Sequence, residues 1–244
     1  MKKFVFVVIG CLFFSIAFSQ DTTPATTTNN KVDFANRSGD HFMFQLSSDH
    51  FAGAPDSISS HQTGLSRGFN AYVMLNKRFK NSPKLSLGIG VGVSTSNIFF
   101  KKVDIDLKAE PGYLPFTPLD STEHFKKYKL ATTFLEIPLE FRYTARPENP
   151  NKSLKVAIGL KVGTLVNVHT KGKTLQDKNG TTLNTYLEKE NSKRFINTTH
   201  FMATARVGYG VFSLFGSYQL NRFLNDGVGP NIKLYQVGLT ISGL

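Results

Sequence analysis

The chain has 244 residues with a formal net charge of +12, a composition that fits one folded domain of moderate size. Its only cysteine, Cys11, lies in the apolar N-terminal segment, which excludes a disulfide scaffold or a thiolate metal site in the remainder of the chain. No later segment reaches 18 consecutive apolar residues, so a helical membrane span is excluded there, and the scattered positive charges argue against nucleic acid as a partner.

The N-terminus has the organisation of a secretory signal peptide. Two lysines precede an apolar run over 4–18, and the small residues at the end of this run predict cleavage after Ser19. We expect residues 1–19 to direct export and then to be removed. The Thr-rich segment 20–39 is expected to be a disordered mature N-terminus, and 40–244 to form the folded domain.

Eight segments of this domain alternate between apolar and polar residues with a period of two, which is the signature of strands. The clearest is 85–94, where leucine, isoleucine and valine alternate with serine and glycine. A helix would mix both kinds of residue on every face. The predicted strands are 41–47, 69–76, 85–94, 135–143, 154–163, 200–209, 212–220 and 235–242.

The connections between these strands alternate in length. Those at one end are long or intermediate and cover 51–66, 101–129, 171–197 and 221–231. Those at the other end are short and comprise 80–83, 144–153 and Gly210. Outer-membrane barrels have short periplasmic turns and longer outer loops. We therefore predict an all-β, transmembrane, antiparallel up-and-down barrel of eight strands with long extracellular loops and short periplasmic turns.

The two faces of the predicted strands identify the inside of the barrel. A soluble, ligand-binding barrel would place its apolar face inward. Here glycine, serine and charged residues share one face, and the other face is almost uniformly large and apolar. The small residues suit a narrow lumen, and several strands are long enough to cross a bilayer at a tilt. The sequence therefore predicts a polar lumen and an apolar surface against lipid.

Charged residues of both signs fall on the predicted lumen face. Glu136 and Glu140 alternate onto one face, and a carboxylate pair is also how glycosidases work. Buried carboxylates must be paired, however, and cationic side chains share the same face. We predict a structural charge network that fills the lumen, with no catalytic residue, cofactor or metal. Its predicted members are Glu136, Glu140, Arg142, Lys155, Lys161 and Arg206.

Two histidines form an alternative, weaker candidate site. His169 follows the fifth predicted strand and His200 begins the sixth, so alternation predicts that both point inward at the outer rim. A rim histidine beside a serine would suit an enzyme that acts on lipid A. No spaced catalytic motif supports this interpretation, and rim histidines are more often only solvated.

The long connections carry many charges. Several basic residues are candidates for contact with lipopolysaccharide phosphates. They are Lys171, Lys173, Lys178, Lys193 and Arg194. A solvated loop without a ligand explains the same residues equally well.

One segment resembles a known family. Residues 135–143, LEIPLEFRY, resemble the "LEIPL…Y" strand of the PorT-like outer-membrane β-barrel proteins of the Bacteroidota, and Phe18-Ser19-Gln20 and 156–165 fit as well. The resemblance covers most of 40–244 and implies an eight-stranded barrel. It implies no activity, although the founding member is an accessory of the type IX secretion system. The chain departs from barrel proteins that end in an aromatic residue, since it ends in Leu244.

Three functional hypotheses follow. The first is a non-enzymatic barrel of a Gram-negative outer membrane with a plugged polar lumen, acting as a structural or accessory component of an envelope or secretion assembly. The second is a rim enzyme that acts on lipid A, and the third is a narrow porin. The expected partners are outer-membrane lipid, lipopolysaccharide, and other outer-membrane or periplasmic proteins.

Overall fold

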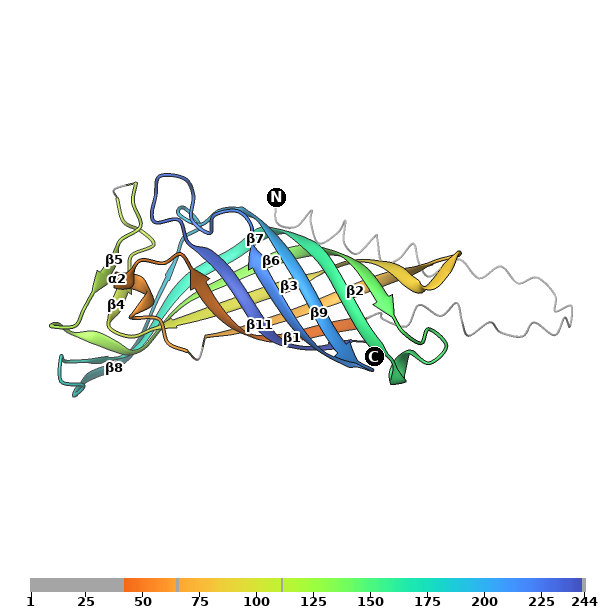
Figure 1. The fold of residues 1–244 in the computed structure, drawn as a ribbon. Coiled ribbons are helices and arrows are strands. Elements are labelled where there is room, and N and C mark those ends of the chain that lie inside the picture. The colour runs from red at the N-terminus through yellow and green to blue at the C-terminus, as the bar shows by residue number, and fades with distance from the viewer. Residues whose placement is uncertain (1–41, 65, 111, 243–244) are drawn as a thin grey trace, which may run out of the picture. The chain divides into compact units, whose positions relative to one another are not determined.

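The computed structural model describes residues 42–64, 66–110 and 112–242. The predicted signal peptide and N-terminal segment, over 1–39, and the terminal Leu244 lie outside the described residues. Within the described part, eight antiparallel strands close into a barrel (Figure 1). They are β1 (Phe42–Ala52), β2 (Arg67–Phe79), β3 (Ser82–Phe100), β6 (His124–Thr144), β7 (Leu154–Gln176), β9 (Thr199–Tyr209), β10 (Phe212–Gln219) and β11 (Lys233–Ser242).

Each barrel strand pairs with its neighbours along the chain, and the barrel closes where β1 pairs with β11. This is the order of an up-and-down barrel, so the predicted fold of eight antiparallel strands is confirmed. The described residues include two helical elements, α2 (Asp56–Ser59) and the short turn η2 (Pro150–Lys152). In the part of the chain that the structure describes, no helix is long and apolar enough to cross a membrane.

The long connections contain more regular structure than the sequence predicted. The predicted loops 101–129 and 171–197 are wrong in part, because β6 begins at His124 and β7 continues to Gln176. The elements inside these connections are β4 (Val103–Ile105), β5 (Phe116–Pro118) and β8 (Thr182–Asn191). β4 pairs with β5, and β8 pairs with the C-terminal end of β7. Figure 1 shows α2, β4, β5 and β8 together at one end of the barrel.

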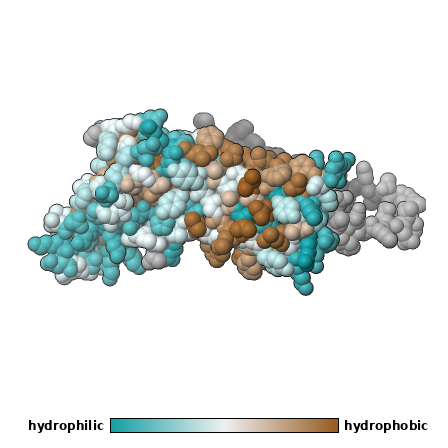
Figure 2. Space-filling view, viewed as in Figure 1, coloured by the Kyte–Doolittle hydropathy of each residue, from teal (hydrophilic) through white to brown (hydrophobic). Residues whose placement is uncertain are grey.

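The outward face of the barrel carries a continuous apolar belt. Its large side chains are about half exposed, with Leu46 at 60% and Leu75 at 63%. Figure 2 shows hydrophobic residues over the barrel wall and hydrophilic residues at the end that holds the long connections. Soluble monomers rarely expose so large an apolar area, whereas a membrane barrel presents such a band to lipid. The predicted arrangement, apolar outside and polar inside, is confirmed.

The interior changes character along the barrel. At the level of the belt most of the buried side chains are polar or charged, for example Gln45, Glu136 and Thr240, beside a small cluster of Met43, Tyr72 and Met74. At the long-connection end, an apolar cap forms where β3, β6 and β7 pack against the connections. Members of this apolar cap include Phe100, Ile105, Leu107, Leu114, Phe195, Ile196 and Leu224. The interior changes from polar to apolar because the solvent outside the wall changes from lipid to water. Strands that extend beyond the lipid into water bury their apolar side chains inward.

A β-bulge in β7 reverses which residues point inward. Val166 is the inserted residue, since its two neighbours pair with consecutive residues of β6. Before the bulge, odd-numbered side chains such as Lys161 are buried, whereas beyond it the even-numbered Val168 and Thr170 are buried. One inserted residue has this effect because the side-chain period of a strand is two.

Candidate functional site

The lumen has space for large charged side chains because glycines line part of the wall. A Cβ atom on Gly163 would lie 2.4 Å from Nε2 of His200 and 2.9 Å from Cγ of Glu136. A Cβ atom on Gly88 would lie 2.7 Å from the guanidinium carbon of Arg142. These positions therefore need the absence of a side chain, which explains the run of small residues on the inward face.

Glu140 is the centre of the ion cluster nearer the short turns. Its Oε2 accepts from Nε of Arg142 at 2.8 Å and from Nη2 of Arg206 at 3.0 Å. Arg206 also donates through Nη1 to Oγ of Ser242 on β11, at 3.1 Å. Glu140 is only 1% exposed, so two guanidinium groups compensate a fully desolvated carboxylate. Three members of the predicted six-residue network, Glu140, Arg142 and Arg206, therefore lie in one ion cluster.

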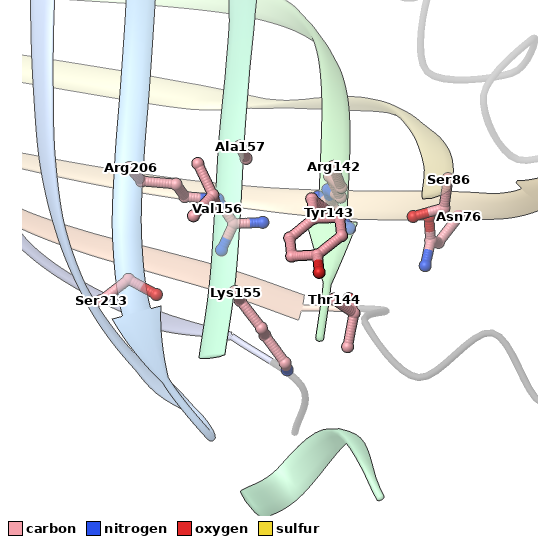
Figure 3. Close-up of a pocket in the computed structure, with 10 residues that line it drawn as sticks. All are labelled: Asn76, Ser86, Arg142, Tyr143, Thr144, Lys155, Val156, Ala157, Arg206 and Ser213. Carbon is pink, nitrogen blue, oxygen red and sulfur yellow. The ribbon is translucent and has the colours of Figure 1, made fainter. Parts of the chain in front are cut away.

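Lys155 lies apart from the buried members of the predicted network. It is half-buried at the mouth of the lumen, where it lines a small cavity of about 20 Å³ together with Arg142 and Arg206 (Figure 3). A cavity of this size has space for one or two water molecules. The short-turn mouth therefore ends in a narrow cationic recess that is too small for an organic substrate.

A second cluster surrounds Glu136 deeper in the lumen. The Tyr72 hydroxyl donates to Oε2 of Glu136 at 2.5 Å, and Nε2 of His200 lies 2.9 Å from Oε1. The Lys161 ammonium donates to the Tyr72 hydroxyl at 3.1 Å and to Oε1 of Gln45 at 3.0 Å. Lys161 also lies over the rings of Tyr72 and Phe215. These contacts compensate the buried carboxylate and the buried ammonium within one cluster.

Neutral polar side chains extend this cluster around the lumen. Gln45 donates to Oγ1 of Thr240 at 3.1 Å and accepts from Nδ2 of Asn70 at 3.2 Å. Asn70 in turn accepts from Oγ of Ser94 at 2.7 Å. The hydrogen-bonded set, which we call the lumen network, thus joins strands on opposite sides of the barrel. The hydrogen bonds given above engage most of its polar groups, although Nδ1 of the buried His200 has no hydrogen-bond partner among the described residues.

The structure does not bring the two predicted rim histidines together. His200 is 1% exposed, lies inside the barrel against Glu136, and stacks on the ring of Phe134 with centroids 3.8 Å apart. The prediction that His169 points inward is wrong. The bulge at Val166 turns it to the outer surface, where its Nδ1 lies 3.0 Å from Nδ2 of Asn167.

Sequence reasoning missed the neutral members of the lumen network. Tyr72 and Asn70 alternate onto the polar face of the second predicted strand, so the signal for an inward position was present. What the pattern does not reveal is which residues of different strands meet. No group of three or more histidine, cysteine or carboxylate side chains suited to a metal ion occurs among the described residues.

The family model described as outer membrane protein beta-barrel domain matches residues 18–240. The match includes seven of the barrel strands completely and all but the last two residues of β11. A comparison with curated proteins finds no match.

Proposed function

Because the chain belongs to the family of the outer membrane protein beta-barrel domain, we propose that it is a non-enzymatic barrel with a closed lumen. Its role is structural or accessory, within an envelope or secretion assembly. The resemblance of residues 135–143 supports a place among the PorT-like proteins of the Bacteroidota, exported by a signal peptide. Outer-membrane lipid and neighbouring envelope proteins are its partners.

The observation that carries this proposal is the compensation of charge inside the lumen. Glu140 is held by Arg142 and Arg206, and Glu136 is held by Tyr72 and His200. An eight-stranded barrel is only wide enough for side chains, and these side chains bond across it. A porin needs a continuous aqueous path, and both the lumen network and the apolar cap lie in that path.

The enzymatic alternative has less support. A general base must be within reach of its substrate, but the imidazole of His200 is buried and lies beside Glu136. His169 is accessible but lies on the opposite surface of the barrel wall. The positions of His169 and His200 therefore do not support a catalytic pair of histidine and serine at the rim. The long connections pack together around the apolar cap. Their outer surface is ordered and is therefore suited to binding a protein partner.

Planar-bilayer recording tests the closed lumen. Purified, folded protein is expected to give no steady conductance, and reproducible channels would overturn the proposal. The accessory role is tested in cells by photo-crosslinking from exposed positions of the long connections, such as Tyr113 and Leu183, with lipid-facing Leu46 as the control position. A specific cross-linked protein is expected from the connections. Recovery of the barrel alone from every position would contradict an accessory role.

A further inference from the structure

Strand alternation sorts the charges of the long-connection end onto two surfaces. Lys129 of β6 pairs with Lys171 of β7, which in turn pairs with Lys189 of β8. The three lysines therefore form one row across neighbouring strands, which lie about 4.8 Å apart. One step further from the belt, Lys127 pairs with Lys173 in the same way.

Carboxylates of the same region lie on the other surface. Glu188 and Glu190 alternate with Lys189 along β8 and line an inner cavity of about 140 Å³ with Asp104 and Asp106. Among the described residues, no carboxylate lies within ion-pair distance of the lysine row. Like charges placed opposite one another on a sheet repel, so the row is destabilising unless an anion joins it.

The electrostatics of the row favour a bound anion. Burial lowers the pKa of Lys129 from its ordinary value, and Lys171 and Lys189 lower it further. Lys129 is also held in place, since its ammonium donates to Oδ1 of Asn97 at 2.6 Å and lies over the ring of Phe99. His169 lies beside the same lysines. A bound phosphate would relieve the repulsion between all of these groups.

A cavity adjoins the row on the side of β2 and β3. Its volume is about 730 Å³, and it is bounded by the loop after α2 and by the facing ends of β3 and β6. Its lining includes the cations Arg67, Lys101, Lys126 and Lys127 and no carboxylate. The aromatic side chains of Phe99 and Tyr128 complete its wall. The cavity is large enough for a sugar phosphate and has the charge to attract one.

The position of this surface relative to the belt favours a lipid phosphate as the ligand. On β6 the last outward apolar residue of the belt is Leu135, and Lys129 lies six residues further along the strand. That is about 20 Å of tilted strand, and lysine stems reach back toward the interface. The cations therefore lie on the outward side of the wall beyond the apolar belt, and their side chains can reach back toward phosphates of the lipid surface.

We propose that this cationic surface, made of Lys127, Lys129, Lys171, Lys173, Lys189 and the adjoining cavity, binds the phosphate groups of an anionic glycolipid in the leaflet on the long-connection side. The inference rests on the proposed membrane placement of the barrel. It adds the class of lipid and the residues that bind it. Several cations spread over neighbouring strands suit a headgroup with more than one phosphate, because each phosphate can meet a different pair of lysines.

Native mass spectrometry of the full barrel in mild detergent tests the proposal. The probes are bis-phosphorylated lipid A, the same lipid A after removal of both phosphates, and inorganic phosphate alone. The test variant carries Lys127→Gln, Lys129→Gln, Lys171→Gln and Lys189→Gln. The matched control carries Lys77→Gln, Lys80→Gln, Lys84→Gln and Lys152→Gln, which remove the same charge at exposed positions near the short-turn end of the barrel.

The native barrel and the control variant are expected to retain bis-phosphorylated lipid A, and the test variant is expected to bind it about tenfold more weakly or worse. The proposal would be overturned if the test variant bound bis-phosphorylated lipid A as tightly as the native barrel does. It would also be overturned if the native barrel bound the dephosphorylated lipid equally well, or if it bound inorganic phosphate but not lipid A. Circular dichroism and heat-modified gel mobility show that both variants fold. The conductance and crosslinking experiments are independent of the lysine row, so a failure here is distinguishable from a failure of the proposed function.

Discussion

Oε1 of Glu136 and Nε2 of His200 lie 2.9 Å apart inside the lumen, although the two residues come from β6 and β9, which do not pair with each other. Gly163 of the intervening strand β7 pairs with both residues and has no side chain to separate them. The contact thus depends on three strands that must close in the correct register. A glycine at position 163 therefore matters for a contact that forms only when the barrel is closed.

Loss of the imidazole is expected to destabilise the barrel. In His200→Ala the Glu136 carboxylate stays buried but keeps only the Tyr72 hydroxyl and the nearby Lys161 charge. The free energy of unfolding should fall by on the order of 3 kcal/mol, the usual cost of removing one partner of a buried pair. Urea unfolding in lipid vesicles measures this. Adding Glu136→Gln to His200→Ala should recover part of the loss, and strict additivity of the two changes would contradict the coupling.

A methyl group at Gly163 is expected to disturb the same contact from the wall. In Gly163→Ala the new Cβ would lie 2.4 Å from the imidazole nitrogen of His200, which must then move. We expect a loss of about 1–3 kcal/mol in the free energy of unfolding. Gly216→Ala on β10 is the matched control, because its Cβ would meet nothing closer than 3.9 Å. If both variants have the native stability, the close approach at Gly163 has no energetic consequence.

The sequence predicts the barrel well where lipid and lumen impose opposite demands on alternate residues. Segment 85–94 is the clearest example, because its outward residues meet lipid and its inward residues meet a crowded lumen. The contrast between the two faces disappears above the lipid. There β8 has polar residues on both faces, so its sequence predicts a loop. A single inserted residue such as Val166 leaves no compositional mark, which is why the orientation of His169 was wrong. Contacts between distant strands, such as Tyr72 with Glu136, depend on the closed register.

The apolar cap is expected to fold and loosen separately from the membrane part of the barrel. Ile105 of β4 is fully buried in the apolar cap, so Ile105→Ala leaves a cavity and should cost about 2–4 kcal/mol locally. Limited proteolysis should then cut the connection between β3 and β6, while the barrel core remains resistant. Leu183→Ala, at a half-exposed position of β8, serves as the control and should leave the cleavage pattern unchanged. Loss of protease resistance in the whole barrel would contradict separate folding.

The titration of His169 reports directly on the lysine row. Burial lowers its pKa below the ordinary value of 6.5, and the charges of Lys189, Lys129 and Lys171 lower it further. The folded protein thus holds this proton less tightly than the unfolded chain does. The contribution of His169 to stability is therefore full above about pH 6.5 and declines as the pH falls below that value.

NMR of ring-labelled histidine in detergent measures this pKa, with the His169→Gln variant assigning the resonance. Lys189→Gln should raise the pKa of His169 toward its ordinary value, since the charge of Lys189 lowers this pKa more than those of Lys129 and Lys171 do. Lys178→Gln, at the exposed tip of the same hairpin, should leave it unchanged because the charge there is distant and screened. Bound bis-phosphorylated lipid A should raise the pKa as Lys189→Gln does, because a phosphate neutralises the row. A native pKa above 6.5 in lipid-free protein would contradict the cationic cluster around His169.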